Sequence, residues 1–360
     1  MPAPAKTRIL VVDDSVVVRK ILTEILSGDP ELEVAGTASN GQIALSKFPQ
    51  LKPDFILLDV EMPEMDGLAT LKELRRIDRK VPIVMFSTLT ERGAAITLNA
   101  LSLGASDYCT KPTNTHSLSE SADTIRAELI PKIKALCKAA KLVRDPRVAP
   151  SSRTIPAVRM PRKIDVVAIG TSTGGPNALA EVIPAIPADF PVPIVIVQHM
   201  PPTFTTLLAQ RLASQSAILV NEARQGDVLS PGRAWLAPGG RHMVLARDGT
   251  SVQVKLNDDP PENFCRPAVD PLFRSVARLY GANALGVVLT GMGCDGLVGS
   301  RSIRDAGGEV ILQDEKTSVV WGMPGSIYDA GVSEQTFPLS RLASEILRLA
   351  SWGRIISDRK

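Results

Sequence analysis

The architecture of the chain is set by Val166-Val167-Ala168-Ile169-Gly170-Thr171-Ser172-Thr173-Gly174-Gly175-Pro176. The apolar residues at its start predict a buried strand, and residues 177–186 that follow it are typical of a helix. Between them the chain must turn tightly, which glycine allows because it has no Cβ. Residues 170–174 match G-x-S-x-G, the pattern of a nucleophile elbow, in which a sharp turn exposes a serine hydroxyl at the sheet edge. The pattern predicts that Ser172 is a catalytic nucleophile.

Length and composition indicate a globular protein of more than one domain. A chain of 360 residues with 44% hydrophobic and 22% charged residues is expected to form two domains and a linker. A net charge of +3 gives no support for nucleic-acid binding, and no apolar run reaches the ~18–20 residues that span a bilayer. The four cysteines lack C-x-x-C spacing, which argues against zinc or a disulfide framework. With no signal-peptide pattern at the N-terminus, we expect a reduced, cytoplasmic protein that does not insert into a membrane.

Strand and helix patterns alternate in both halves of the chain, which predicts an α/β fold. Residues 1–128 contain five strand-like runs and are predicted to form a five-stranded parallel, doubly wound domain. Proline-rich, basic sequence without periodicity predicts a linker within residues 129–163. Residues 164–352 are predicted to form a second α/β domain with a mainly parallel sheet. Its insertion is a β-hairpin that turns at Asp248-Gly249.

Polar residues follow four of the predicted strands of the first domain. Asp13 and Asp14 follow the first strand, Asp59 the third, Ser87 the fourth and Lys111 the fifth. The carboxyl ends of parallel strands meet at one sheet edge, so three carboxylates are expected to converge there and to bind a hard cation such as Mg²⁺. A hydroxyl and an ammonium group can then hold the oxygens of a phosphoryl group. This arrangement makes Asp59 a nucleophile that forms an acyl phosphate, although any one of these acids could instead be a helix cap.

These positions resemble those of a response-regulator receiver domain. The resemblance covers residues 7–128 and is carried by Val11-Val12-Asp13-Asp14-Ser15, by Leu58-Asp59-Val60-Glu61-Met62-Pro63-Glu64-Met65-Asp66-Gly67, by Phe86-Ser87-Thr88 and by Thr110-Lys111-Pro112. It implies Mg²⁺-dependent phosphorylation of Asp59 by a partner histidine kinase. Tyr108 stands where the family often has a switch aromatic, but a half-buried strand tyrosine is an equal alternative.

In the second domain Ser172 needs a base and an orienting acid. The chain has three histidines, and His199 directly follows the predicted strand 194–198. Asp295 lies in a glycine-rich loop after the strand 285–289, so three strand ends can bring Ser172, His199 and Asp295 together. The order Ser, His, Asp differs from that of α/β-hydrolases. Backbone N–H groups near Met292 in the same loop are candidate oxyanion donors.

Three alternatives stay open on the residues alone. His242 can replace His199 as the base, whereas His116 lies in the first domain and is discounted. Asp295 alone can be a helix cap. Residues 291–296 also match G-x-G-x-x-G, and Asp314 follows the next strand, which is close to a dinucleotide-binding fingerprint. That hypothesis leaves Ser172 and His199 without a role.

Residues 164–350 resemble the catalytic domain of chemotaxis protein-glutamate methylesterases. The resemblance is carried by residues 170–176, Gln198-His199-Met200-Pro201, Ala237-Pro238-Gly239-Gly240-Arg241-His242, Arg266-Pro267-Ala268-Val269-Asp270 and residues 290–296. By position, it implies a triad of Ser172, His199 and Asp295, with no cofactor for the esterase chemistry.

The resemblance also implies what this site acts on. It implies hydrolysis of glutamate γ-methyl esters on the cytoplasmic helices of chemoreceptors with release of methanol, and it allows deamidation of receptor glutamines. The unphosphorylated first domain is expected to cover the site. A regulated binding module without turnover is the alternative function class.

Overall fold

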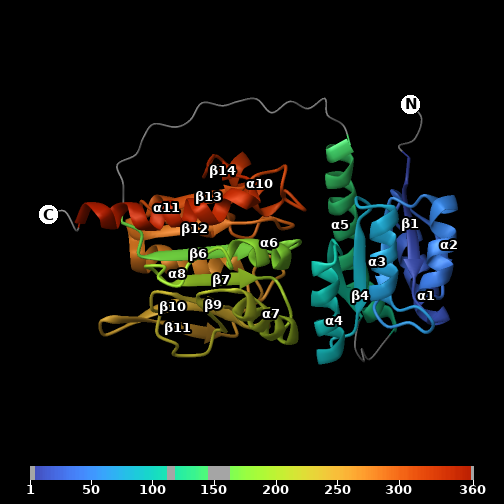
Figure 1. Cartoon of the computed structure of the whole chain (residues 1–360), viewed down its shortest axis with the longest axis horizontal. Coiled ribbons are helices and arrows are strands. Elements are labelled where there is room, and N and C mark those ends of the chain that lie inside the picture. The colour runs from blue at the N-terminus through green and yellow to red at the C-terminus, as the bar shows by residue number, and fades with distance from the viewer. Residues whose placement is uncertain (1–4, 112–117, 145–162, 358–360) are drawn as a thin grey trace. The chain divides into compact units, whose positions relative to one another are not determined.

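The computed structural model describes residues 5–111, 118–144 and 163–357, and the chain divides into two compact units, Met1–Arg147 and Val148–Lys360 (Figure 1). Each unit has its own parallel sheet. Within the described residues, every helix is too short or too polar to span a lipid bilayer.

The first unit is built on a five-stranded sheet in the order β2-β1-β3-β4-β5, and its strand pairs are parallel. Every residue of the central strand β3 and of its neighbour β4 is buried and most are apolar, as expected where helices cover both faces of a sheet. The strands are β1 (Thr7–Val12), β2 (Leu32–Ala38), β3 (Phe55–Asp59), β4 (Ile83–Ser87) and β5 (Asp107–Thr110). This order confirms the predicted doubly wound α/β fold.

Five helices alternate with these strands: α1 (Val16–Ser27), α2 (Gly41–Leu51), α3 (Gly67–Ile77), α4 (Glu91–Ser102) and α5 (Leu118–Arg144). Four of them begin at a residue whose side chain accepts a hydrogen bond from a backbone N–H of the first turn, namely Ser15, Asn40, Asp66 and Thr90. Helix α1 packs with α5, while α2, α3 and α4 pack in series. The helices therefore form two groups, one for each face of the sheet.

Helix α5 extends further than the sequence pattern indicates. The predicted linker begins at residue 129, but α5 continues to Arg144. Its later turns bury Ile133 and Leu136, and buried Lys132 pairs with Asp107 of β5 at 3.1 Å. These contacts hold the first part of the 129–163 segment as helix on the first unit. Residues 145–162 lie outside the described residues.

The second unit has a seven-stranded parallel sheet in the order β14-β13-β12-β6-β7-β9-β8. Its central strands β12, β6 and β7 are buried at every position. The strands are β6 (Val166–Thr171), β7 (Ile194–Gln198), β8 (Leu219–Glu222), β9 (Arg233–Leu236), β12 (Ala284–Val288), β13 (Glu309–Gln313) and β14 (Thr336–Phe337). The predicted second α/β domain is confirmed, with the short edge strand β14 as an addition that its sequence did not indicate.

The hairpin insertion is also confirmed. Strands β10 (His242–Asp248) and β11 (Ser251–Asn257) pair antiparallel and turn through Gly249, whose φ of 56° lies in the left-handed region. The remaining helical elements are α6 (Gly175–Val182), α7 (Pro202–Gln215), α8 (Val269–Tyr280), the 3₁₀ turn η1 (Gly281–Asn283), α9 (Leu297–Asp305), α10 (Met323–Asp329) and α11 (Leu339–Ser357).

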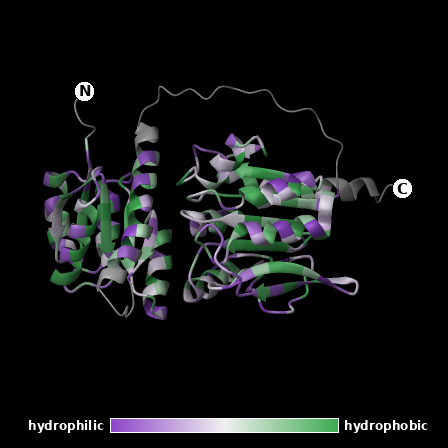
Figure 2. Ribbon diagram, turned by 180° about the vertical axis from the view of Figure 1, so that it is seen from behind, coloured by the Kyte–Doolittle hydropathy of each residue, from purple (hydrophilic) through white to green (hydrophobic). Residues whose placement is uncertain are grey.

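The helices of the second unit form two groups around its sheet. Helix α6 contacts α7 and α11, and α9 contacts α8 and α10. Figure 2 shows that hydrophobic residues concentrate along the strands, while hydrophilic residues mark the outer faces of many helices. The core of this unit therefore lies between the sheet and its helices, which leaves the strand ends free to carry polar side chains.

Candidate functional site

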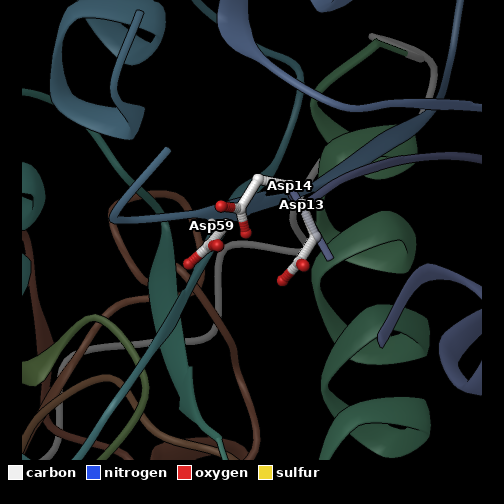
Figure 3. Close-up of side chains that lie close together, drawn as sticks. All are labelled: Asp13, Asp14 and Asp59. Carbon is white, nitrogen blue, oxygen red and sulfur yellow. The ribbon is translucent and has the colours of Figure 1, made fainter. Parts of the chain in front are cut away.

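In the first unit, Asp13 and Asp14 directly follow β1 and Asp59 ends β3 (Figure 3). One carboxylate oxygen from each lies within 4.8 Å of the others. Asp13 and Asp59 are buried and Asp14 is exposed, so the cluster has one open side. Such a set of oxygen donors fits a hard divalent cation such as Mg²⁺, which keeps several water ligands.

The Lys111 ammonium neutralises part of this buried negative charge. Its Nζ lies 2.9 Å from Asp13 Oδ2 and 2.8 Å from Asp59 Oδ2. Burial raises the pKa of Asp59 from 3.8 to about 6 even though Lys111 opposes the shift. Burial alone would lower the pKa of Lys111, but the two carboxylates raise it. Lys111 is therefore held as a cation beside an aspartate that is costly to ionise.

The other two predicted residues of this site lie on β4 and β5. Ser87 is fully buried at the end of β4, and its Oγ donates to the Thr88 carbonyl at 3.2 Å. Tyr108 is 6% exposed, and Lys132 Nζ lies 5.4 Å from the centre of its ring. Burial raises the pKa of Tyr108 well above its usual value. Tyr108 is thus a buried strand tyrosine in this conformation, and its role as a switch stays a prediction.

In the second unit, the glycine-rich turn after β6 places Ser172 at the carboxyl end of the sheet. The left-handed residue of this turn is Gly174, with a φ of 78°, and α6 starts at the next residue. Ser172 N–H donates to the Thr290 carbonyl at 3.1 Å, and its carbonyl accepts from Gln198 Nε2 at 2.9 Å. The serine backbone is therefore tied to the ends of both neighbouring strands, β12 and β7.

The loop after β12 passes very close to this serine. A Cβ on Gly291 would lie 3.0 Å from Ser172 Cβ and 2.3 Å from Met323 Sδ, so only glycine fits there. Among the described residues, neither the Met292 N–H nor the Thr173 N–H makes a hydrogen bond. Two unpaired backbone donors beside a serine are suited to binding an oxyanion.

His199 and Asp295 are brought together from different strand ends. His199 Nε2 lies 2.7 Å from Asp295 Oδ2, and both side chains are largely buried. Burial alone would lower the pKa of His199, but its hydrogen bonds with Asp295 and Cys265 raise it. Burial alone would raise the pKa of Asp295, but its hydrogen bond with His199 lowers the pKa of that carboxyl. The pair therefore keeps Asp295 charged and makes the imidazole a stronger base.

The second ring nitrogen of His199 faces a cysteine. Cys265 Sγ lies 3.3 Å from His199 Nδ1, and the described Ser172 hydroxyl makes no hydrogen bond to either ring nitrogen. Because Nε2 is engaged with Asp295, Nδ1 is the nitrogen left to accept a proton. Ser172 and the His199–Asp295 pair thus lie at neighbouring strand ends without a closed hydrogen-bonded triad in this conformation.

Backbone and side-chain donors surround the Asp295 carboxylate. Oδ2 also accepts from Val269 N–H at 2.6 Å, and Oδ1 accepts from the N–H groups of Asp270 and Gly296 at 3.0 and 2.9 Å. Asn263 Nδ2 contributes a further hydrogen bond to Oδ1 at 3.1 Å. Asp295 therefore orients the start of α8 as well as His199, and it does more than cap the helix that follows it.

The alternative base, His242, has both ring nitrogens engaged by backbone. Its Nδ1 accepts from Ala268 N–H at 3.2 Å, and its Nε2 lies 3.1 Å from the Pro260 carbonyl. With 1% exposure it fixes the chain before α8, and no ring nitrogen is available to a serine. His116, which was discounted, lies outside the described residues.

The dinucleotide hypothesis is not supported by these contacts. Asp295, inside the glycine loop, points to His199, and Gly291 packs against Ser172 and Met323. The acid expected to bind a ribose, Asp314, instead accepts hydrogen bonds from the N–H and hydroxyl of Thr317 at 3.0 and 2.6 Å. Asp314 therefore caps the turn after β13.

Five further residues shape this site without having been predicted to do so: Thr173, Gln198, Asn263, Cys265 and Asp270. Gln198 and Asp270 lie inside motifs that carried the resemblance, so their spacing is a signal, although it does not show where their side chains point. Asn263 and Cys265 precede the Arg266-Pro267 motif and had no signal of their own. The contacts of Asn263 with Asp295 and of Cys265 with His199 join segments that are distant in the sequence, so no local pattern indicates them.

Comparison with protein families identifies both units. The family model described as CheB methylesterase matches residues 167–346, and that of the response regulator receiver domain matches residues 9–123. The chain belongs to the CheB methylesterase family. The curated relatives align along nearly the whole chain, across both matched regions.

A relative from Trichodesmium erythraeum (strain IMS101), named protein-glutamate methylesterase/protein-glutamine glutaminase, is 54% identical over 347 residues, 95% of this chain and 99% of its own. One of the same name from Nocardioides sp. (strain ATCC BAA-499 / JS614) is 48% identical over 95% of this chain and 94% of its own. The crystal structure of the Thermotoga maritima CheB methylesterase catalytic domain is 40% identical with a TM-score of 0.51. It covers 52% of this chain and 100% of that one. This likeness supports the fold assigned to the second unit.

Proposed function

We propose that this chain is a phosphorylation-activated protein-glutamate methylesterase of the cytoplasm that acts on the methylated helices of chemoreceptors. The observation that carries the proposal is the buried His199–Asp295 pair at the same sheet edge as Ser172, next to two unpaired backbone N–H groups. Family membership and the names of the relatives support the same substrate class. No cofactor is required for this chemistry.

The arrangement supports acyl transfer in two steps. Ser172 Oγ attacks the ester carbonyl while His199 takes its proton at Nδ1, and Asp295 holds the imidazole through Nε2. The N–H groups of Met292 and Thr173 stabilise the oxyanion. The proton on Nδ1 passes to the leaving methoxide, which departs as methanol, and water then hydrolyses the acyl-enzyme to the free glutamate. The same steps on a glutamine amide release ammonia, which accounts for a glutaminase activity.

The receiver supplies the control. Asp59 accepts a phosphoryl group from a histidine kinase, with Mg²⁺ held by Asp13, Asp14 and Asp59. Bound Mg²⁺ supplies positive charge that neutralises the phosphoryl oxygens. Lys111 already lies within 2.8 Å of Asp59 and can pair with one of these oxygens, while the Ser87 hydroxyl can donate to another. Lys111 must then exchange its carboxylate partners for the phosphoryl group.

Phosphorylation and esterase activity are coupled in this proposal by a population shift. The unphosphorylated receiver covers the esterase site, and phosphorylation of Asp59 favours an open arrangement. Each tenfold gain in activity requires about 1.4 kcal/mol of differential stability between the covered and open states. The coupling therefore needs only a few changed contacts.

The test is methanol release from methylated receptor membranes by the wild type and Ser172→Ala, with and without Mg²⁺ and a small-molecule phosphodonor. Release that requires Ser172 and rises with phosphodonor is expected. The Ser172→Ala variant should retain at most the residual ~10³–10⁴-fold acceleration over water that oxyanion binding sustains. No release by folded wild type under any of these conditions would favour a regulated binding module. Full activity in Ser172→Ala would exclude Ser172 as the nucleophile.

A further inference from the structure

A short turn, Glu262–Cys265, lies against the His199–Asp295 pair. Its ends are bridged by two backbone hydrogen bonds, from Glu262 N to the Cys265 carbonyl at 3.1 Å and in the reverse direction at 2.9 Å. The Arg274 guanidinium of α8 then clamps it by donating to both carboxylate oxygens of Glu262 at 2.8 and 2.5 Å. The turn is therefore fixed from outside the site.

The backbone of this turn takes an uncommon conformation. Asn263 and Phe264 both have positive φ values, 50° and 63°. Asparagine tolerates the left-handed region, but a bulky residue such as phenylalanine is strained there. Such strain persists only where surrounding contacts hold it, and it clusters at functional sites. Since the Phe264 side chain is fully exposed, the contacts that hold this backbone come from its neighbours.

Those contacts lead directly to the site. Asn263 Nδ2 donates to Asp295 Oδ1 at 3.1 Å and to Asp270 Oδ2 at 3.2 Å, so one amide bridges two buried carboxylates. Two residues later, Cys265 Sγ meets His199 Nδ1. One turn thus contacts both members of the pair that serves Ser172.

The bridged carboxylates would otherwise repel each other. Burial raises the pKa of Asp270 to about 6, and the charge of Asp295 adds to this shift, while Gly299 N–H and Asn263 oppose it. The two protons of the Asn263 amide satisfy one oxygen of each acid, which an alkyl group or a third carboxylate in this place cannot do. The amide therefore keeps Oδ2 of Asp295 turned toward His199.

We propose that Asn263 is a positioning residue of the esterase: by bridging Asp270 and Asp295 it fixes the carboxylate that orients His199. This inference rests on the proposed esterase function. Among the described residues the Asn263 side chain bonds to Asp270, Asp295 and Cys294 and not to Ser172, so it should act through Asp295 on the rate of the chemical steps and leave substrate binding unchanged. A misplacement of the base by about 1 Å can cost on the order of 10²-fold in rate.

The test compares Asn263→Gly with Asn263→Asp in the full-length protein. Glycine keeps the positive φ and removes only the amide, whereas aspartate keeps the φ and adds a third carboxylate. Both are expected to lower kcat for methanol release by roughly 10- to 100-fold with KM within about twofold.

The pH profile separates positioning from simple destabilisation. The charged or titratable groups around His199 are Asp295 and Cys265 in contact, with Asp270, Glu262 and Arg274 behind them. An added carboxylate at position 263 favours protonated His199, so the acidic limb of the Asn263→Asp profile should lie at higher pH than that of Asn263→Gly. A loss of folded protein would lower both curves without moving their midpoints.

Asn221→Ala is the matched control, because Asn221 is an exposed residue of β8 distant in sequence from this turn. Its kcat and KM should equal those of the wild type. Ser172→Ala, measured in parallel, tests the function itself. If it retains full activity, the proposed function fails. If it is inactive but Asn263→Gly keeps kcat within twofold of the wild type, the positioning role is overturned.

Discussion

Replacement of Asp59 by asparagine should stabilise the first unit at neutral pH while abolishing phosphorylation. Asp59 is 2% exposed, and burial raises its pKa from 3.8 to about 6. The folded state binds a proton on Asp59 more tightly than the unfolded state does. The protonated carboxyl therefore contributes its full stabilisation of the fold below pH 3.8, and this stabilisation is lost as the pH rises through about 6. The difference of roughly 2 pKa units corresponds to about 3 kcal/mol. Because asparagine is neutral, the variant avoids burying a charge at neutral pH and recovers part of this free energy.

The expected gain in unfolding free energy at pH 7.5 without Mg²⁺ lies between about 1 and 3 kcal/mol. It falls short of the full value because Lys111 loses one of its two carboxylate partners. Mg²⁺ should reduce or reverse the difference in unfolding free energy between Asp59→Asn and the wild type, since a cation at 100 times its Kd stabilises the wild type by about 2.7 kcal/mol. The variant, which lacks one ligand, should gain less from Mg²⁺.

Urea unfolding followed by circular dichroism and by tryptophan fluorescence separates the two units. All three tryptophans, Trp235, Trp321 and Trp352, belong to the second unit, so a transition seen only by circular dichroism reports the first. Glu73→Gln on the surface of α3 is the control and should stay within about 0.5 kcal/mol of the wild type. If Asp59→Asn unfolds at the same or a lower urea concentration than the wild type at pH 7.5, the buried charge is not a source of instability.

Three further predictions concern the esterase. Asp295→Asn should lower kcat for methanol release by about 10⁴-fold with the fold retained, because an amide favours the wrong imidazole tautomer; a loss below tenfold would contradict its orienting role. Methanol release should rise with pH through a midpoint above 6.5, because Asp295 and Cys265 raise the pKa of His199 and only the neutral ring is a base; a lower midpoint in the pH profile would argue against this. Deletion of residues 1–147 should raise basal methanol release, and a folded fragment no faster than the full chain would rule out covering by the receiver.

Much of this architecture could be predicted because it depends on local sequence. Buried parallel strands appear as apolar runs, and residues such as Ser15 and Asp66 mark helix starts through hydrogen bonds that span only three residues. Strand ends of one parallel sheet meet at one edge, so His199 and Asp295 could be expected to meet although 96 residues separate them. The end of the first domain was harder to place, because the helix that continues past residue 128 belongs to that domain only through burial of Ile133 and Leu136 against the first unit.

The finer structure of the site depends on side-chain directions that no local pattern contains. Asn263 reaches Asp295 only because the chain doubles back at Glu262–Cys265, and this turn is held by Arg274 from the next helix. The sequence favours His199 as the base but leaves His242 as an alternative, since each lies next to a strand. The folded chain resolves this choice, because both ring nitrogens of His242 are bonded to backbone groups. Such contacts between distant segments can be found only in the folded chain.

Two buried aspartates at strand ends have opposite electrostatics, and the number of donors around them is the reason. Asp295 accepts hydrogen bonds from three backbone N–H groups and two side chains, and its pKa is lowered despite burial. Asp59 has Lys111 and one distant N–H, at 3.4 Å, and burial raises its pKa. A carboxylate that orients a base must stay charged, so its charge is solvated by the protein. In the proposed mechanism Asp59 accepts a phosphoryl group, and its under-solvated charge would favour binding of Mg²⁺ and of the phosphoryl group.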